Sequence, residues 1–190
     1  KMARSAGKSH TLAEALWASN IHEARILASM IQPSKSLTEE QMDRWVRDFN
    51  SWDLCDQCCN NLFRKWPRAH EKALAWSIRD EEFVKRAGFV LMACLAVHDK
   101  QAPDERFLEY FSEIQRASVD PRNYVKKAVN WALRQIGKRN ATVNAEAIKT
   151  ARTIHALESQ AAKWIATDAL RELTSPAVQA RLGIVAGAAE

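Results

Sequence analysis

The segment EEFVKRAGFVLMACLAV, residues 81–97, decides the fold that the sequence predicts. From Phe83 onward it is apolar on almost every side, apart from the cations Lys85 and Arg86 near its start. A helix that is apolar all round is buried among other elements rather than laid on a surface. We therefore expect this helix at the centre of an all-helical protein, with neighbours on several sides.

Helical spacing and end signals continue along the rest of the chain, and we find no credible strand. Thr38 and Gln41 match a capping box. Asp120 and Pro121 stand where a cap and a first helical residue belong, and Gly137 where a left-handed terminator belongs. The predicted helices span residues 10–19, 21–31, 38–48, 53–65, 68–77, 81–97, 104–117, 122–136, 142–157, 160–173 and 176–182.

A short internal sequence repeat indicates how these helices are arranged. Asp80 followed by VKRA at 84–87 recurs as Asp120 followed by VKKA at 125–128, about forty residues later, the period of HEAT-like repeats. We expect one domain, residues 1–190, that forms an α-solenoid of antiparallel HEAT-like helix pairs. Its concave face is the natural binding surface and is expected to be basic.

Composition agrees with this fold class. The chain has 190 residues, 47% hydrophobic and 27% charged, with only five glycines and five prolines, which argues against long disorder and an all-β fold. A net charge of +5 suits a polyanionic partner such as DNA. Neither a membrane helix nor a signal peptide is found, so we expect a cytoplasmic monomer, nucleoid-associated if the source is bacterial.

Three of the four cysteines, Cys55, Cys58 and Cys59, crowd into one predicted helix. This geometry is poor for a disulfide framework, and no second pair of ligands completes a zinc site. We therefore expect reduced thiols that pack a helix interface, and neither a metal nor another cofactor.

The helix 122–136 carries a tryptophan away from its apolar stripe. At 100° per residue, Trp131 falls on the same side as Lys127, Arg134 and Lys138, nearly opposite the buried positions. Such a face suits DNA, because cations take phosphates and the ring meets a sugar or base. The alternative is a tryptophan packed on a neighbouring helix beside solvated charges.

Two further positions are unusual. Asp56 lies one turn after Trp52, at a seam between polar and apolar sides, which suits a catalytic carboxylate; the alternative is a helix N-terminal charge, a role that fits Asp53 better. Arg86 opposes the positive end of its helix dipole, so a partner must compensate it. An internal aspartate, a DNA phosphate or a purely structural ion pair would serve.

Three segments together resemble the DNA alkylation repair family, AlkD-like glycosylases made of HEAT-like repeats. They are SWDLCD at 51–56, EEFVKRAGFVL at 81–91 and YVKKAVNWALRQIG at 124–137, and the likeness runs from about residue 12 to 183. By position, Asp56 looks like the family's catalytic carboxylate, Trp52 and Trp131 its paired aromatic residues, and Arg86 its motif arginine. The expected DNA-binding cations are Lys85, Lys127, Arg134 and Lys138.

The resemblance implies a DNA repair glycosylase that removes cationic N3- or N7-alkylated purines from duplex DNA without base flipping. A base that already carries positive charge departs without a general acid, so one carboxylate suffices. The chief rival is a non-catalytic HEAT-like protein that binds damaged or branched DNA, and a third reading is a protein-binding scaffold. Ser51 stands where family members often have a further tryptophan, and the chain is expected to lack the family's N-terminal helices.

Overall fold

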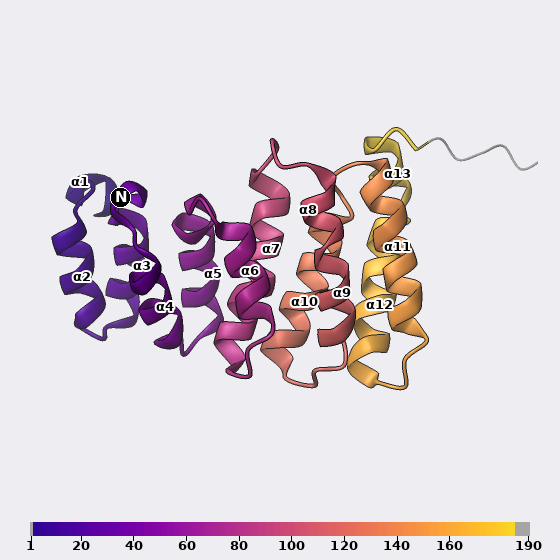
Figure 1. Cartoon of the computed structure of the whole chain (residues 1–190), viewed down its shortest axis with the longest axis horizontal. Coiled ribbons are helices and arrows are strands. Elements are labelled where there is room, and N and C mark those ends of the chain that lie inside the picture. Colours follow the sequence, from indigo (N-terminus) through magenta and orange to yellow (C-terminus); the bar gives the residue numbers. More distant parts are fainter. Residues whose placement is uncertain (1, 185–190) are drawn as a thin grey trace, which may run out of the picture.

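A computed structural model describes residues 2–184, and within that range every regular element is a helix (Figure 1). The elements in chain order are α1 (Met2–Ala6), α2 (His10–Ala18), α3 (His22–Ile31), η1 (Ser34–Ser36), α4 (Glu39–Arg47), α5 (Trp52–Asn61), η2 (Phe63–Lys65), α6 (Ala69–Ser77), α7 (Glu82–His98), α8 (Asp104–Leu108), α9 (Tyr110–Ala117), α10 (Asn123–Ile136), α11 (Ala141–His155), α12 (Gln160–Leu173) and α13 (Pro176–Arg181).

The helices follow one another along the long axis, from α1 and α2 at one end to α11–α13 at the other (Figure 1). In one layer, here called the inner layer, α3, α5, α7, α10 and α12 each pack against the next. In the outer layer, α2, α6, α9 and α11 pack against α3, α7, α10 and α12. This arrangement confirms the predicted α-solenoid of HEAT-like helix pairs.

The apolar helix α7 is the centre of the core, as its sequence predicts. It packs against α5, α6 and α10, and all residues from Ala87 to Ala96 are buried. A Cβ added to Gly88 would lie 2.4 Å from the backbone nitrogen of Ser77 and 2.8 Å from the carbonyl oxygen of Ala73. Gly88 therefore allows α6 to approach α7 backbone to backbone.

Several predicted helix ends were wrong in detail. The predicted helix 104–117 is divided into α8 and α9. Helix α10 begins at Asn123, so Pro121 lies outside it, and the Asp120 side chain accepts a hydrogen bond from the backbone nitrogen of Arg122 at 3.1 Å. Local side-chain hydrogen bonds of this kind compete with the first helical turn.

Gly137 does follow the last residue of α10, but not in the left-handed conformation that was expected. Its φ of −65° is right-handed helical. A Cβ at this position would lie 2.7 Å from Cβ of Ala147 and 2.8 Å from Cδ2 of Leu173. Close packing of α11 and α12, rather than a special backbone angle, therefore explains this glycine.

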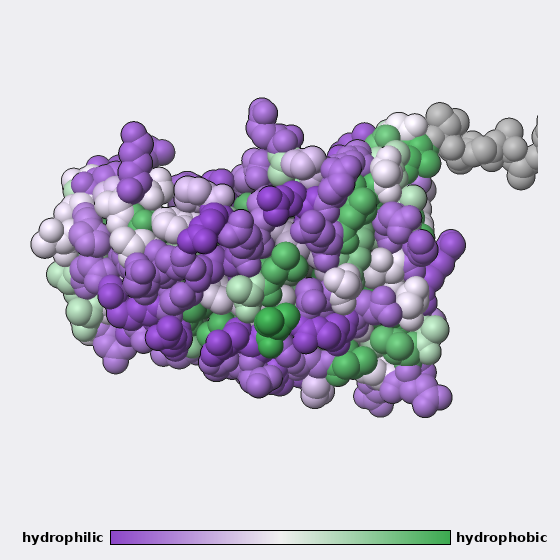
Figure 2. Space-filling view, viewed as in Figure 1, coloured by the Kyte–Doolittle hydropathy of each residue, from purple (hydrophilic) through white to green (hydrophobic). Residues whose placement is uncertain are grey.

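The side of the molecule seen in Figure 2 is mainly hydrophilic, with smaller apolar groups between the polar residues. Within residues 2–184, no helix combines the length and the hydrophobicity needed to cross a membrane.

Candidate functional site

Asp56 on α5 and Arg86 on α7 form an ion pair between two neighbouring helices of the inner layer. Nε of Arg86 donates to Oδ1 of Asp56 at 3.0 Å, and Nη2 donates to Oδ2 at 2.9 Å. This two-point contact is the strong geometry of a guanidinium with a carboxylate. Arg86 therefore has the internal aspartate partner that its position in an apolar helix requires.

A third hydrogen bond fixes the Arg86 guanidinium. Its Nη1 donates to the backbone oxygen of Tyr124, at the start of α10, at 2.7 Å. The Arg86 side chain is only 6% exposed. Arg86 is thus committed to α5 and α10, which favours a role in orienting Asp56 over a direct contact with a DNA phosphate.

Trp52 and Trp131 line the same cavity as Asp56, with a volume of about 320 Å³. Trp52, in the first turn of α5, is 53% exposed, whereas Trp131 on α10 packs partly on the core. When the amide oxygen of Gln135 is turned towards the indole, it accepts a hydrogen bond from Nε1 of Trp131 at 3.1 Å. The structure therefore brings Trp52, Asp56 and Trp131 together, with Arg86 behind the carboxylate.

The surroundings of Asp56 alter its proton affinity. Burial raises the pKa of its carboxyl group above the ordinary value, the Arg86 hydrogen bond and charge oppose this rise, and the charge of Asp53 adds to it. The Asp56 side chain is 19% exposed. A carboxylate of raised proton affinity that still faces a cavity can accept a proton from a water molecule.

Asp53, one turn earlier on α5, has a different environment. Its Oδ2 lies 2.8 Å from Nε2 of His22 on α3. Although burial works in the other direction, the hydrogen bond from His22 lowers the pKa of Asp53. Its place in the first turn and its partner on α3 suit the helix-end role that the sequence favoured for Asp53.

The expected DNA-binding cations of α10 differ in their surroundings. Lys127 is exposed and forms no ion pair within residues 2–184. Arg134 pairs with Asp168, at 2.9 Å, and with Glu172, and Lys138 pairs with Glu172. The acids of α12, which the helical wheel of α10 does not show, balance much of this positive charge.

Lys85, the remaining expected DNA contact, lies next to the loop before α10. Its Nζ is 3.3 Å from Oδ2 of Asp120, and its side chain is 16% exposed. Arg122 pairs with the same carboxylate, at 2.6 Å. A DNA-binding role for Lys85 would have to compete with this ion pair, and it stays a prediction.

Sequence reasoning missed part of the cavity wall. The further lining residues are Gln57, Asn60, Ala93, Cys94, Val97 and His98. Asn60 lies one turn after Asp56, so helical spacing alone could have identified it. His98 is the last residue of α7, and its position beside Asn60 depends on how α7 packs against α5.

Cys55 and Cys59 pack the interface between α5 and α7. Sγ of Cys55 and Sγ of Cys59 lie 3.9 Å and 3.7 Å from the carbonyl oxygens of Phe83 and Ala87. The thiols are free and buried, and burial raises the pKa of Cys59 well above its ordinary value. Over residues 2–184, no group of three or more His, Cys, Asp or Glu side chains is placed to hold a metal ion.

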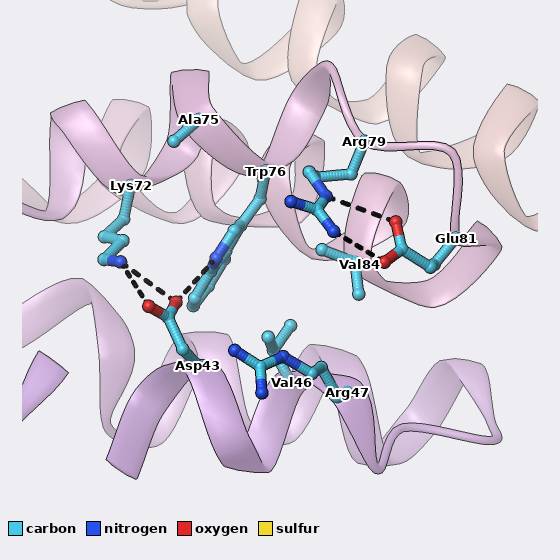
Figure 3. A pocket seen from close by; sticks show the side chains of 9 residues that line it. All are labelled: Asp43, Val46, Arg47, Lys72, Ala75, Trp76, Arg79, Glu81 and Val84. Carbon is cyan, nitrogen blue, oxygen red and sulfur yellow. Dashed lines mark hydrogen bonds and ion pairs between the residues drawn. The ribbon is translucent and has the colours of Figure 1, made fainter. Parts of the chain in front are cut away.

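A second pocket lies between α4, α6 and the start of α7 (Figure 3). It is smaller, about 180 Å³. Two of its cations already have acidic partners, because Lys72 donates to Asp43 at 2.9 Å and Arg79 pairs with Glu81 at 2.8 Å (Figure 3). None of the site residues expected from the sequence lines it, so the cavity at Asp56 is the stronger candidate.

The fold is that of a HEAT-like helical repeat protein. One solved structure, described as "A new family of proteins related to the HEAT-like repeat DNA glycosylases with affinity for branched DNA structures", matches with a TM-score of 0.75 and 18% sequence identity. The match covers 96% of this chain and 79% of that one. Among curated proteins, none matches the chain.

The sequence also matches a family model. The model is that of the DNA alkylation repair enzyme family, and it covers residues 1–173. The chain belongs to this family, which confirms the resemblance drawn from its three motif segments.

Proposed function

We propose that the protein is a DNA glycosylase that excises cationic N3- or N7-alkylated purines from duplex DNA by hydrolysing the N-glycosidic bond, without base flipping. The observation that supports this most directly is the cavity that Asp56 shares with Trp52 and Trp131, with the carboxylate oriented by Arg86. Membership of the DNA alkylation repair enzyme family agrees with it.

The reaction needs one carboxylate and no general acid. Alkylation makes the base cationic, so the bond between the base and C1′ of the deoxyribose breaks with its electron pair going to the base, which departs neutral. Positive charge then moves to the sugar, where the Asp56 carboxylate stabilises it. A water molecule attacks C1′, its proton passes to Asp56 and then to solvent, and the products are a free base and an abasic site.

The other three residues support this step. Trp52 and Trp131 hold the sugar and the cationic base by stacking and cation–π attraction, each on the order of 0.5–2 kcal/mol. Arg86 acts as a positioning residue, because its hydrogen bonds to both Asp56 oxygens and to Tyr124 fix the carboxylate between α5 and α10. We assign the exposed Lys127 to a nearby phosphate.

Release of 7-methylguanine from methylated duplex DNA tests the proposal. Wild type is expected to release the base, and Asp56→Asn to lose most of this activity. Asp53→Asn, on the same helix but paired with His22, is the matched control and is expected to retain it. Release that is equally fast in wild type and Asp56→Asn would overturn the role of Asp56.

A second candidate function is binding of branched DNA without catalysis. It is favoured by the fold match to a structure that is described by its affinity for branched DNA. Affinities for a four-way junction and for a duplex of equal length distinguish the candidates when measured beside base release. Tight junction binding with no release of 7-methylguanine by wild type would favour this second function.

A further inference from the structure

A group of cations without acidic partners lies next to the Asp56 cavity. We call it the cationic rim and define it as Lys8, Arg64, Lys65 and Lys100, next to the imidazole of His98. The rim adjoins the cavity through Asn60 and His98, which both line it. Nε2 of His98 lies 3.1 Å from Oδ1 of Asn60, and Nε of Arg64 donates to the backbone oxygen of Asn60 at 2.6 Å.

Like Lys127, and unlike the other cations expected to bind DNA, the rim has no acid to balance it. Within residues 2–184, none of its members forms an ion pair, whereas Lys85, Arg134 and Lys138 all do. Instead, Lys8 donates to the carbonyl oxygen of Met30 at 2.7 Å.

Mutual repulsion lowers the proton affinity of groups at the rim. Burial, followed by the charges of Lys8 and Arg64, lowers the pKa of Lys65. Burial, followed by the charges of Arg64, Lys100 and Lys65, lowers the pKa of His98. Like charges gathered in this way destabilise the free protein and are relieved when an anion binds between them.

Helix capping explains only part of this arrangement. Arg64 and Lys65 donate to carbonyl oxygens at the end of α5, where cations are favoured by the helix dipole. Arg64 and Lys65 are enough to cap this helix end, so capping does not explain the further cations Lys8 and Lys100. Lys100 comes two residues after His98, the end of α7. Lys8 precedes α2 and donates to Met30 near the end of α3, the helix that packs against α5.

We propose that the cationic rim binds backbone phosphates of the DNA strand that crosses the Asp56 cavity, and so provides the principal phosphate contact in place of the paired cations Lys85, Arg134 and Lys138. This inference rests on the proposed function, since it assigns the phosphate contacts of the same site. A DNA phosphate bound at the rim lies beside the cavity and needs no contact with the side chain of Arg86, which already pairs with Asp56.

Duplex DNA binding, measured against salt concentration, tests the inference. The rim variant combines Arg64→Gln, Lys65→Gln and Lys100→Gln. The control variant removes the same number of charges from α9 and α11 in the outer layer, with Arg116→Gln, Lys149→Gln and Arg152→Gln. Both variants are compared with wild type by fluorescence anisotropy with a labelled, undamaged duplex, and thermal unfolding is recorded for each.

The rim variant is expected to bind at least about tenfold more weakly at 0.1 M salt, with a log–log salt slope shallower by about 2, equivalent to two lost phosphate contacts. The control variant is expected to keep the wild-type slope. The charge-retaining variant Arg64→Lys, Lys65→Arg and Lys100→Arg should bind like wild type, which separates loss of charge from loss of fold.

The other outcomes are separable. An equal loss of duplex affinity in the rim and control variants would show an effect of net charge alone. It would overturn the proposed role of the rim. If the rim variant binds the duplex as tightly as wild type, the proposed role of the rim is overturned. The proposed glycosylase function is not affected by that result. A wild type that binds no DNA at any salt concentration would overturn the glycosylase proposal and the rim with it.

Discussion

The Asp56–Arg86 pair is the residue-scale feature on which the site depends. Both side chains are largely buried, and the carboxylate receives two hydrogen bonds from one guanidinium. Removing one partner of such a pair leaves an uncompensated charge, which costs far more than the pair itself contributes. Orientation of the carboxylate and stability of the inner layer are therefore coupled at this position.

Arg86→Ala is expected to lower the free energy of unfolding by about 3–5 kcal/mol and to reduce base release, because Asp56 loses its partner. Arg86→Lys restores the charge but not the two-point geometry, so we expect partial recovery of stability and less of activity. Urea unfolding and 7-methylguanine release measure the two effects. Unchanged stability in Arg86→Ala would show that the pair does not hold α5 against α7.

The pH dependence of base release follows from the raised pKa of Asp56. In the proposed mechanism the ionised carboxylate is the active form, so we expect activity to be lost as the pH falls through this pKa. We expect the midpoint of the acid limb above about 3.9, the value of an unperturbed aspartate. Linkage has the opposite sign for stability, since ionisation of Asp56 costs folding free energy as the pH rises through the same pKa. A single-turnover pH profile with a midpoint at or below the unperturbed value would contradict this.

Trp52 offers a functional test with little effect on folding, because the residue is 53% exposed. Trp52→Ala is expected to slow base release roughly 2- to 30-fold, the equivalent of about 0.5–2 kcal/mol of cation–π attraction. Trp164→Ala is the matched control, since Trp164 on α12 is 42% exposed and lies outside the cavity. Equal effects of the two substitutions would remove the special role of Trp52.

The residues of the site could be predicted from the sequence better than the ion pairs that these residues form with other helices. Trp52 and Asp56 share a helix face by spacing alone, and Arg86 is unusual within an apolar helix. Which acid pairs with Arg86 depends on the packing of α5 against α7, and the neutralisation of Arg134 by Asp168 on the packing of α10 against α12. These contacts join residues about thirty positions apart, beyond the reach of helical periodicity.

At the scale of the element, α7 joins the fold to the site. It carries Arg86 near its start, and its residues 87–96 are buried against α5, α6 and α10. Its position followed from its composition, because a helix that is apolar all round has to be central. The ends of other helices, such as α10, depended on local hydrogen bonds and were predicted less well.

Gly88→Ala is expected to destabilise the protein by at least about 2 kcal/mol, because the new methyl group would meet the backbone of α6. Gly137→Ala should cost less, since its Cβ would meet the side chains of Ala147 and Leu173 rather than a backbone. Thermal unfolding of both variants checks this order. A Gly88→Ala variant as stable as wild type would contradict the close approach of α6 and α7.

At the scale of the whole molecule, the solenoid brings distant segments of the chain together at one site. Asp56, Arg86 and Trp131 come from α5, α7 and α10, and the inner layer sets these helices side by side. The repeat period predicted this architecture. The balance of charges around the site could not be predicted from any single helix, because the cations and their acidic partners lie on different helices. Acids from α12 balance α10, and positive charge remains unbalanced at the cationic rim.

We infer that Asp56 acts in the chemical step and not in DNA binding. Single-turnover release of 7-methylguanine from a saturated duplex, measured for wild type and Asp56→Asn together with their duplex affinities, tests it most directly. We expect at least about a hundredfold slower release in Asp56→Asn, as for loss of an electrostatic group in other enzymes, with affinity nearly unchanged. Equal release rates for the two proteins would contradict it.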